Sequence, residues 1–239
     1  MNTSIVLGLQ YGDEGKGATV HHLSNDQTLN IRFNGGQQAG HTVESKGFRH
    51  VFSSIGSGSL NGADTFISKY CTIYPKSMSN EYNALRGAKF RPNIFLDPLA
   101  MVTTPFDIDD NRAKARLNGH GSVGMGFGET INRNENSPHK LFVSDLLYYP
   151  ILRHKLENIA KYYNAIHVDA QISKFIQQVE EMLMFVKIKS PKKMFFYDYE
   201  RVVFEGAQGI MLDMDHGYFP YVTRSNCTSK NAIQIIKDF

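Results

Sequence analysis

The sequence lacks the features that would place the protein outside the cell, in a membrane or on nucleic acid. Its two cysteines, Cys71 and Cys227, supply neither a disulfide framework nor the spacing of a metal site. No basic segment followed by an apolar run opens the chain, and no stretch is long and apolar enough to cross a bilayer. The net charge of +3 is not concentrated into a stripe that would bind nucleic acid. These absences favour a cytoplasmic protein without membrane or nucleic-acid partners.

Alternating strand and helix patterns predict an α/β fold. The length of 239 residues suits one domain, 1–239, because neither a repeat nor a clear linker is visible. Strands are expected at residues 4–8, 29–33, 93–96 and 201–205, and helices at residues 15–24, 77–88, 107–117, 144–164 and 170–188. Residues 117–138, rich in glycine and asparagine, are expected to form a loop. The order predicts a mostly parallel central sheet flanked by helices, with ligands at the carboxyl ends of its strands.

Two glycine-rich segments follow the first two predicted strands. Residues 8–17 read GLQYGDEGKG, and residues 34–42 read NGGQQAGHT. Glycines allow backbone N–H groups to approach a phosphate, and a lysine such as Lys16 suits the outer phosphates of a nucleotide. Asp13 suits Mg²⁺ binding or proton transfer. The first segment is neither a Walker A loop, because Gly17 replaces the hydroxyl residue, nor a G-x-G-x-x-G pattern. The pattern predicts a nucleotide-using enzyme, with a plain glycine-rich turn as the alternative.

Three separate blocks of the chain resemble the adenylosuccinate synthetase family. Residues 10–17, QYGDEGKG, are similar to the family's QWGDEGKGK. Residues 39–42, AGHT, resemble its NAGHT signature, and residues 204–223, FEGAQGIMLDMDHGYFPYVT, resemble FEGAQGxLLDxDHGTYPYVT. The blocks occur in the family's order, so the resemblance implies a ligase with a P-loop-NTPase-like fold that is incomplete at its C-terminal side.

The resemblance implies a two-step reaction. GTP phosphorylates the 6-oxygen of IMP, and the amine of L-aspartate then displaces the phosphate to give adenylosuccinate, with Mg²⁺ as cofactor and a homodimer as the assembly. Asp13 would take the proton from purine nitrogen 1 and bind Mg²⁺, to which Gly40 would offer its carbonyl. Lys16 would neutralise phosphoryl charge, and His41 would donate a proton to the γ-phosphoryl group. Gln208 would hold the purine edge.

The same resemblance implies a set of nucleotide-binding residues. Thr223 would bind the 5′-phosphate of the nucleotide. The full set is Gly12, Glu14, Gly15, Gly17, Gln38, Ala39, Thr42, Ser122, Val123, Arg133 and Thr223. Outside this set, Glu205 could orient the substrate loop from a strand end. Asp213 is expected to be structural, and Asp107 is expected at a helix N-terminus.

The chain also departs from the family pattern. Gln38 stands where the family has asparagine, and residues 121–128, GSVGMGFG, replace the family's TTGRGIGP loop, so that Met125 takes the place of an arginine. Arg133 is the candidate for the arginine that the family sends across its dimer interface. The family's T-x-G-R-x-R aspartate loop and its guanine-reading Lys-x-Asp element do not occur in the sequence. A longer product, completion by another chain or a changed activity would each account for this.

Three interpretations of function remain open. Residues 223–228, TRSNCT, look closer to archaeal and phage branches, one of which acts on dGMP, with ATP as the alternative to GTP. That branch typically loses the aspartate of the first loop, so the retained Asp13 favours IMP over GMP or dGMP. The third interpretation is a non-ligating protein that binds a purine nucleotide, but the retained Asp13, Lys16, His41 and Gln208 favour catalysis.

Overall fold

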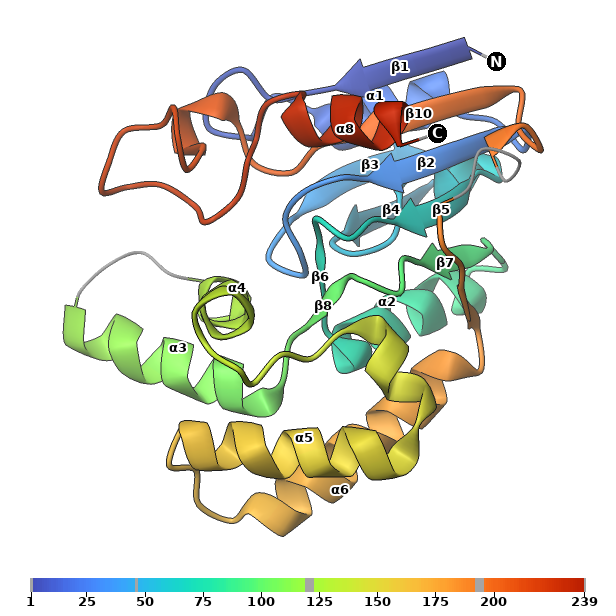
Figure 1. Ribbon diagram of the computed structural model, residues 1–239. Coiled ribbons are helices and arrows are strands. Elements are labelled where there is room, and N and C mark those ends of the chain that lie inside the picture. The colour runs from blue at the N-terminus through green and yellow to red at the C-terminus, as the bar shows by residue number, and fades with distance from the viewer. Residues whose placement is uncertain (1, 46, 119–122, 192–195, 239) are drawn as a thin grey trace.

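The computed structural model describes residues 2–45, 47–118, 123–191 and 196–238 and is built around a parallel sheet (Figure 1). The sheet has six strands in the order β1-β10-β2-β5-β7-β9, and every neighbouring pair is parallel. Its strands are β1 (Asn2–Val6), β10 (Arg201–Glu205), β2 (Thr28–Arg32), β5 (Asp64–Ile67), β7 (Ile94–Leu96) and β9 (Val186–Ile188). The predicted α/β fold with a mostly parallel sheet is confirmed.

Smaller strand pairs and helices complete the described structure. The strand pairs are the antiparallel β3 (His41–Ser45) with β4 (Phe48–Phe52), and the parallel β6 (Thr72–Ile73) with β8 (Met101–Val102). The α-helices are α1 (Lys16–Leu23), α2 (Pro75–Gly87), α3 (Pro105–Asn118), α4 (Phe127–Asn136), α5 (Tyr149–Tyr162), α6 (Val168–Leu183) and α8 (Lys230–Lys237). Three 3₁₀ turns are η1 (Ser57–Asn61), η2 (Val143–Leu147) and η3 (Ile210–Leu212). None of the helices in the described ranges is long and apolar enough to cross a membrane.

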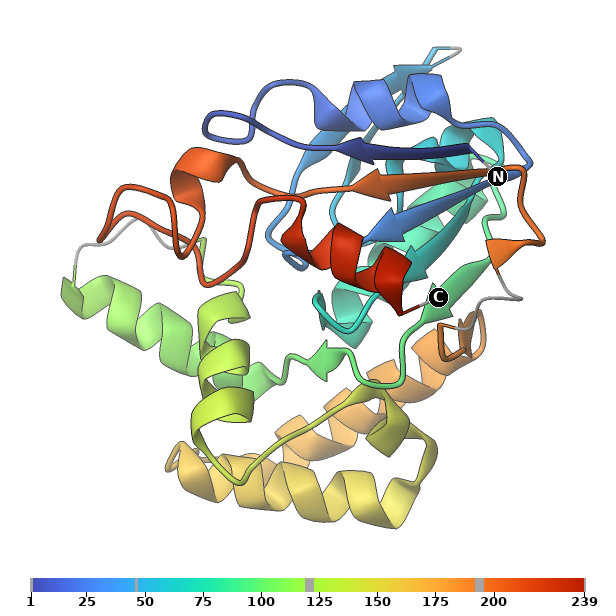
Figure 2. The same cartoon turned by 45° about the horizontal axis from the view of Figure 1, so that its top comes forward.

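The two faces of the sheet carry different side chains because successive residues of a strand point to opposite faces. On one face, Leu29 and Ile31 of β2 pack with Phe204 of β10 and with Ile235 of α8. Figure 2 shows α8, in red, lying in front of this sheet. On the other face, Asn30 accepts a hydrogen bond from the η1 backbone. A second apolar cluster includes residues of the helices α2, α3, α5 and α6. Of these, α5 and α6 lie at the bottom of Figure 1. The polar residues of β2 therefore lie on the face that α1 and η1 cover.

Several predicted boundaries are wrong. The short strands β5 and β9 were not expected, and β9 occupies the end of the predicted helix 170–188. The predicted helix 144–164 is interrupted at Tyr148, where the chain leaves η2 and α5 begins, with Pro150 in its first turn. The predicted loop 117–138 contains α4. The sequence of α4 is polar, so this helix is stabilised by tertiary partners that a local sequence pattern does not reveal.

Candidate functional site

The first glycine-rich loop lies against the block that follows β10. The N–H groups of Ile210 and Met211 donate to the carbonyls of Gly8 (2.9 Å) and Gln10 (3.0 Å). Gly12 adopts a left-handed φ of 104°, and a Cβ there would lie 2.7 Å from the carbonyl carbon of Gln208. Only glycine permits this approach. Segments almost 200 positions apart in the sequence thus meet at the carboxyl ends of β1 and β10.

Lys16 opens α1 and is held inside this loop. Its side chain is 3% exposed, and Nζ donates to the carbonyl of Gly12 at 2.9 Å and lies 3.8 Å from a carboxylate oxygen of Glu14. Burial lowers the pKa of Lys16, while Glu14 opposes that shift. Gly15, with a φ of 83°, precedes the helix. Asp13 is exposed at the tip of the same loop.

His41 begins β3 and is paired with the carboxylate that ends β10. Its Nδ1 lies 2.5 Å from Oε1 of Glu205. Oε1 also accepts a hydrogen bond from the hydroxyl of Ser57 (2.5 Å), and Oε2 accepts one from the N–H of Ser57 (2.9 Å). Gly17 packs against the histidine, because a Cβ there would lie 2.7 Å from Cβ of His41. Nε2 of His41 is buried and has no hydrogen-bond partner among the described residues.

Burial and the neighbouring charges together favour an ionised carboxylate and a neutral imidazole. Burial alone raises the pKa of Glu205, but the positive charge of Arg32 and the hydrogen bonds from His41 and Ser57 outweigh it and lower the pKa to about 2. Arg32 is the register partner of Glu205 on β2. Burial lowers the pKa of His41, against the opposing effect of Glu205. Glu205, a residue that the sequence left as a possible orienting group, is therefore central to the site.

The second glycine-rich loop is attached to the same block. The Asn34 side chain donates to the carbonyl of Ala207 (2.9 Å) and accepts from its N–H (2.7 Å). A Cβ on Gly35 would lie 2.7 Å from Cβ of Ala207 and 3.3 Å from Oε1 of Gln208. Gln208 itself has a left-handed φ of 60°, and its buried Oε1 has no partner in the described part of the chain. Three sequence motifs thus converge on Gln208.

Gln37 is a site residue that sequence analysis missed. Its Nε2 donates to the carbonyl of Met125 at 2.7 Å, and its Oε1 accepts from the hydroxyl of Thr72 at 3.2 Å. It thereby attaches the loop before α4 to the second glycine-rich loop. Both amide atoms of the neighbouring Gln38 are buried without a partner among the described residues. The pair of glutamines is visible in the sequence, but nothing in the sequence indicates that Gln37 anchors the loop and that Gln38 does not.

The other candidates occupy less distinctive positions. Ala39 is half-buried in a turn closed by its N–H on the Gly36 carbonyl (3.1 Å), and Thr42 is exposed on β3. Val123 is 72% exposed. The N–H of Thr223 donates to the carbonyl of Leu212 (2.8 Å), which holds it beside η3. Ser122 lies outside the described residues.

Arg133 does not lie where a nucleotide could reach it, so the expectation of an arginine at a dimer interface is corrected. Its side chain is 0% exposed and donates to Oδ1 (2.8 Å) and Oδ2 (2.9 Å) of Asp107 and to the carbonyls of His139 and Val102. Asp107 lies in the first turn of α3, as predicted, and also accepts from the N–H of Thr104 (2.7 Å). A guanidinium with these partners is structural, because moving it would leave a buried carboxylate unpaired.

Asp213 is also structural, as the sequence predicted. It is fully buried, and its carboxylate accepts hydrogen bonds from the N–H groups of Asp215 (2.8 Å), His216 (3.0 Å) and Cys227 (2.5 Å). These bonds fix the loop between η3 and α8. Among the residues that the structure describes, no group of three or more histidine, cysteine, aspartate or glutamate side chains could hold a metal ion.

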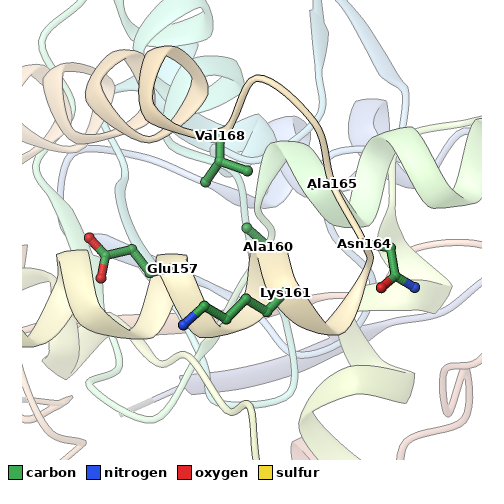
Figure 3. Close-up of a pocket in the computed structure, with 6 residues that line it drawn as sticks. All are labelled: Glu157, Ala160, Lys161, Asn164, Ala165 and Val168. Carbon is green, nitrogen blue, oxygen red and sulfur yellow. The ribbon is translucent and has the colours of Figure 1, made fainter.

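Hollows on the surface do not by themselves identify the site. One of about 590 Å³ lies between α5 and α6, where Glu157, Lys161 and Asn164 surround an open space (Figure 3). Another of about 330 Å³ runs along β1 and is lined by Glu14 and Lys16. The first contains none of the converging loops, so we place the candidate site at the ends of β1, β2 and β10.

Comparisons with known proteins identify the family of the chain. The sequence profile of adenylosuccinate synthetase matches residues 5–236. Adenylosuccinate synthetases of Xanthomonas euvesicatoria pv. vesicatoria (strain 85-10) and Xylella fastidiosa (strain 9a5c) are 32% and 33% identical to this chain over 246 residues. Each alignment covers 96% of this chain but only 57% of the relative, so the chain spans little more than half of their length.

Solved structures share the fold. Fully ligated adenylosuccinate synthetase from Plasmodium falciparum superimposes with a TM-score of 0.80 at 21% identity, over 98% of this chain and 57% of that one. Succinoaminodeoxyadenylate synthetase (PurZ) of cyanophage S-2L, bound to dGMP and dATP as an energy donor, gives a TM-score of 0.68 at 21% identity, over 99% and 59%. With its three motifs joined in one site, and a profile match over nearly its whole length, the chain belongs to the adenylosuccinate synthetase family.

Proposed function

We propose that this chain is a purine-nucleotide ligase that forms adenylosuccinate from IMP, GTP and L-aspartate. The observation that carries the proposal is the convergence of Lys16, His41 and Gln208 at one edge of the sheet, with Asp13 exposed beside them. Each of these residue types has a task in transferring a phosphoryl group to a purine oxygen. Ligands of open parallel sheets bind at this edge, outside the carboxyl ends of the strands.

The triphosphate would lie on the first loop. Gly12 and Gly15 have the positive φ values that turn backbone N–H groups toward an anion, and α1 begins at Lys16 with its positive dipole end. The ammonium group of Lys16 is bonded to the loop itself, so its position is set before a nucleotide binds. A charge placed in advance at the transferring phosphoryl group stabilises the transition state more than a mobile one.

The residues present fit Mg²⁺. This ion is usually held by one or two carboxylates together with phosphates and water rather than by a protein cage. Asp13 is an exposed carboxylate in the loop proposed for the phosphates, and the carbonyl of Gly40 is on the exposed part of the second loop. When bound, Mg²⁺ would neutralise charge on the phosphate oxygens.

The purine would be read by Gln208 and activated by Asp13. Oε1 of Gln208 is a buried polar atom without a partner among the described residues, and a ligand donor would satisfy it. The strained φ of 60° at Gln208 is typical of a functional position. Asp13 would remove the proton from purine nitrogen 1, so that the 6-oxygen becomes a nucleophile for the γ-phosphoryl group.

His41 would act on the γ-phosphoryl group through Nε2. Its Nδ1 is engaged by Glu205, so Nε2 is the nitrogen left for a ligand. To donate from Nε2, the imidazole must carry a second proton, and the ionised Glu205 beside it would stabilise the resulting positive charge. The amine of aspartate then replaces the phosphate on the purine carbon, which completes the ligation.

A second candidate is the corresponding reaction on dGMP. It is favoured by the altered loop 223–228, in which Arg224 donates from Nη1 to Oδ1 of Asn132 on α4 at 3.0 Å. This contact joins the loop with Thr223, which is proposed to bind the 5′-phosphate, to α4, which begins at the end of the altered segment 121–128. Retention of Asp13 supports IMP, so we rank dGMP second.

Chromatographic analysis of products tests the proposal. The purified chain is incubated with Mg²⁺ and L-aspartate, and IMP, GMP and dGMP are each combined with GTP and with ATP. A succinyl-purine from IMP is the expected product, and one from dGMP would favour the second candidate. Binding of nucleotide without any product would contradict both and would indicate a non-ligating binding protein.

A further inference from the structure

Glu205 is the most enclosed carboxylate of the candidate site, and all of its described contacts point to one task. It ends β10 with 0% exposure and accepts hydrogen bonds on both oxygens. Oε2 accepts from the N–H of Ser57, and Oε1 is shared by the Ser57 hydroxyl and Nδ1 of His41. A carboxylate anchored in this way cannot rotate to meet a ligand. Its effect on the reaction must pass through His41.

The imidazole of His41 is fixed from several sides. Gly17 on α1 lies close to its Cβ, and β3 carries it in register with Phe52 of β4. The charged groups around it are Glu205 on β10, Arg32 on β2 and Lys16 on α1. Of the two ring nitrogens, Nδ1 faces the carboxylate, and Nε2 is buried without a partner in the described ranges. The tautomer of a histidine is set by the hydrogen bond that its other nitrogen makes.

We propose, resting on the proposed function, that Glu205 is a positioning residue that keeps a proton on Nδ1 of His41 and reserves Nε2 for the bound nucleotide. An ionised carboxylate can only accept a hydrogen bond, so Nδ1 must be the donor. Nε2 is then the nitrogen that gains or loses a proton at the phosphoryl group. Ser57 holds the carboxylate, so that three side chains are linked by hydrogen bonds: Ser57 of η1, Glu205 of β10 and His41 of β3.

Nitrogen NMR of the protein labelled at its histidine rings tests the tautomer directly. The spectrum of His41→Gln identifies the signals of His41 by their loss. In the unaltered protein, we expect a protonated-type shift at Nδ1 and an unprotonated-type shift at Nε2. A proton on Nε2 instead would overturn the proposal, and this measurement needs neither a nucleotide nor activity.

Glu205→Gln tests the cause. A glutamine amide can donate as well as accept, so we expect the Nδ1–H tautomer to be lost or mixed with the Nε2–H form. Glu205→Asp retains an acceptor-only group and should keep the proton on Nδ1. An unchanged tautomer in a folded Glu205→Gln protein would show that the carboxylate does not set it.

Glu81→Gln is the matched control. Glu81 is also buried and accepts hydrogen bonds from Ser53, Ser54 and Ile55, outside the glycine-rich loops. Glu81→Gln controls for the loss of a buried carboxylate, and the His41 signals should stay unchanged in it.

If the unaltered chain forms product, Glu205→Gln should lower kcat by about 10²-fold or more with little change in KM, since proton transfer and not binding is affected. An equal loss in Glu81→Gln would reduce Glu205 to a structural role. Absence of product from the unaltered chain would overturn the proposed function and leave the tautomer result standing.

Discussion

Several side chains of the site are buried in states that cost free energy. Lys16 and His41 are 3% and 5% exposed, and Nε2 of His41, Oε1 of Gln208 and both amide atoms of Gln38 have no partner among the described residues. A buried polar atom without a hydrogen bond costs about 1–3 kcal/mol. Sites that bind and transform ligands often retain such costs. The positions of these atoms are therefore better explained by a ligand than by stability.

Asp13→Asn should separate catalysis from stability. We expect product formation to fall by at least about 10²-fold, because an amide cannot take a proton from the purine. The unfolding free energy should change by less than about 0.5 kcal/mol, since Asp13 is exposed. Product analysis and urea denaturation measure the two effects. Asp169→Asn on α6, where the carboxylate is 93% exposed, is the control and should alter neither. Full turnover by Asp13→Asn would remove this residue from the mechanism.

Glu205 should make the protein sensitive to acid. Its pKa of about 2 in the folded state lies below the ordinary value of 4.5, so its contribution to stability is present above pH 4.5 and is lost as the pH falls toward 2. The difference corresponds to roughly 3 kcal/mol at neutral pH. His41 has a lowered pKa, so its protonation below its ordinary value of 6.5 weakens the fold in the same direction. Urea denaturation between pH 7 and pH 3 should show a shallower loss for Glu205→Gln, whereas an unchanged slope would contradict this assignment.

At the scale of elements, α4 shows how a polar segment becomes a helix. Its Arg133 reaches Asp107 at the start of α3, and Tyr163 at the end of α5 donates to the same carboxylate at 2.9 Å. Thr130 donates to the hydroxyl of Thr103 at 2.8 Å, next to β8. Asp107 and Thr103 lie 26 and 27 positions from the α4 residues that they contact, so a local reading of residues 117–138 shows only a polar segment rich in glycine and asparagine.

Arg133→Leu should destabilise the contact between α3 and α4. Removing one partner of a buried ion pair leaves Asp107 uncompensated and costs about 3–5 kcal/mol. Thermal and urea denaturation measure the loss. Arg153→Leu, which removes a half-exposed arginine that pairs with Glu157, should have little effect. If Arg133→Leu were as stable as the unaltered chain and instead lost only nucleotide affinity, the expectation of a nucleotide-binding arginine would be reinstated.

Gly209→Ala should separate the first loop from the block after β10. A Cβ at Gly209 would lie 2.2 Å from the carbonyl oxygen of Gln10, so the two segments would have to move apart. We expect a loss of about 1–3 kcal/mol in unfolding free energy and weaker nucleotide binding, measured by denaturation and calorimetric titration. Gly87→Ala, where a Cβ meets nothing within 4 Å, is the control and should leave binding intact. Unimpaired binding by Gly209→Ala would mean that this close approach does not shape the site.

At the scale of the whole molecule, we propose that residues 1–239 act as one domain and that two copies associate. Large apolar side chains are exposed at the junction of η2 and α5, namely Leu147, Tyr148, Tyr149 and Ile151. Exposed apolar groups that lie together commonly mark an interface. Sedimentation analysis should give the mass of two chains, and Tyr149→Glu with Ile151→Glu should shift it toward one. A single-chain mass with nucleotide bound would contradict the proposal.

The sequence predicted the larger part of the fold and supplied most residues of the candidate site. Strand periodicity located four of the sheet strands, and the glycine-rich loops with the block 204–223 identified Lys16, His41 and Gln208 as candidates. It located β7, which has three residues, but missed the similarly short β5 and β9, because strands of three or four residues carry too few alternations for the pattern to decide reliably between strand, loop and helix. It missed the anchoring role of Gln37, because the carbonyl that this side chain contacts lies 88 positions away.

The sequence by itself determined the family and the chemical inventory, because both depend on residue types at short, fixed spacings. Only the tertiary structure decided which of those residues act together. It placed Glu205 beside His41 across 164 positions, since parallel β10 inserts between β1 and β2. It also enclosed Arg133 with Asp107 and thereby removed that arginine from the nucleotide site. Pairing of distant strands and burial of charges depend on the packed whole, and for that reason no local pattern could specify them.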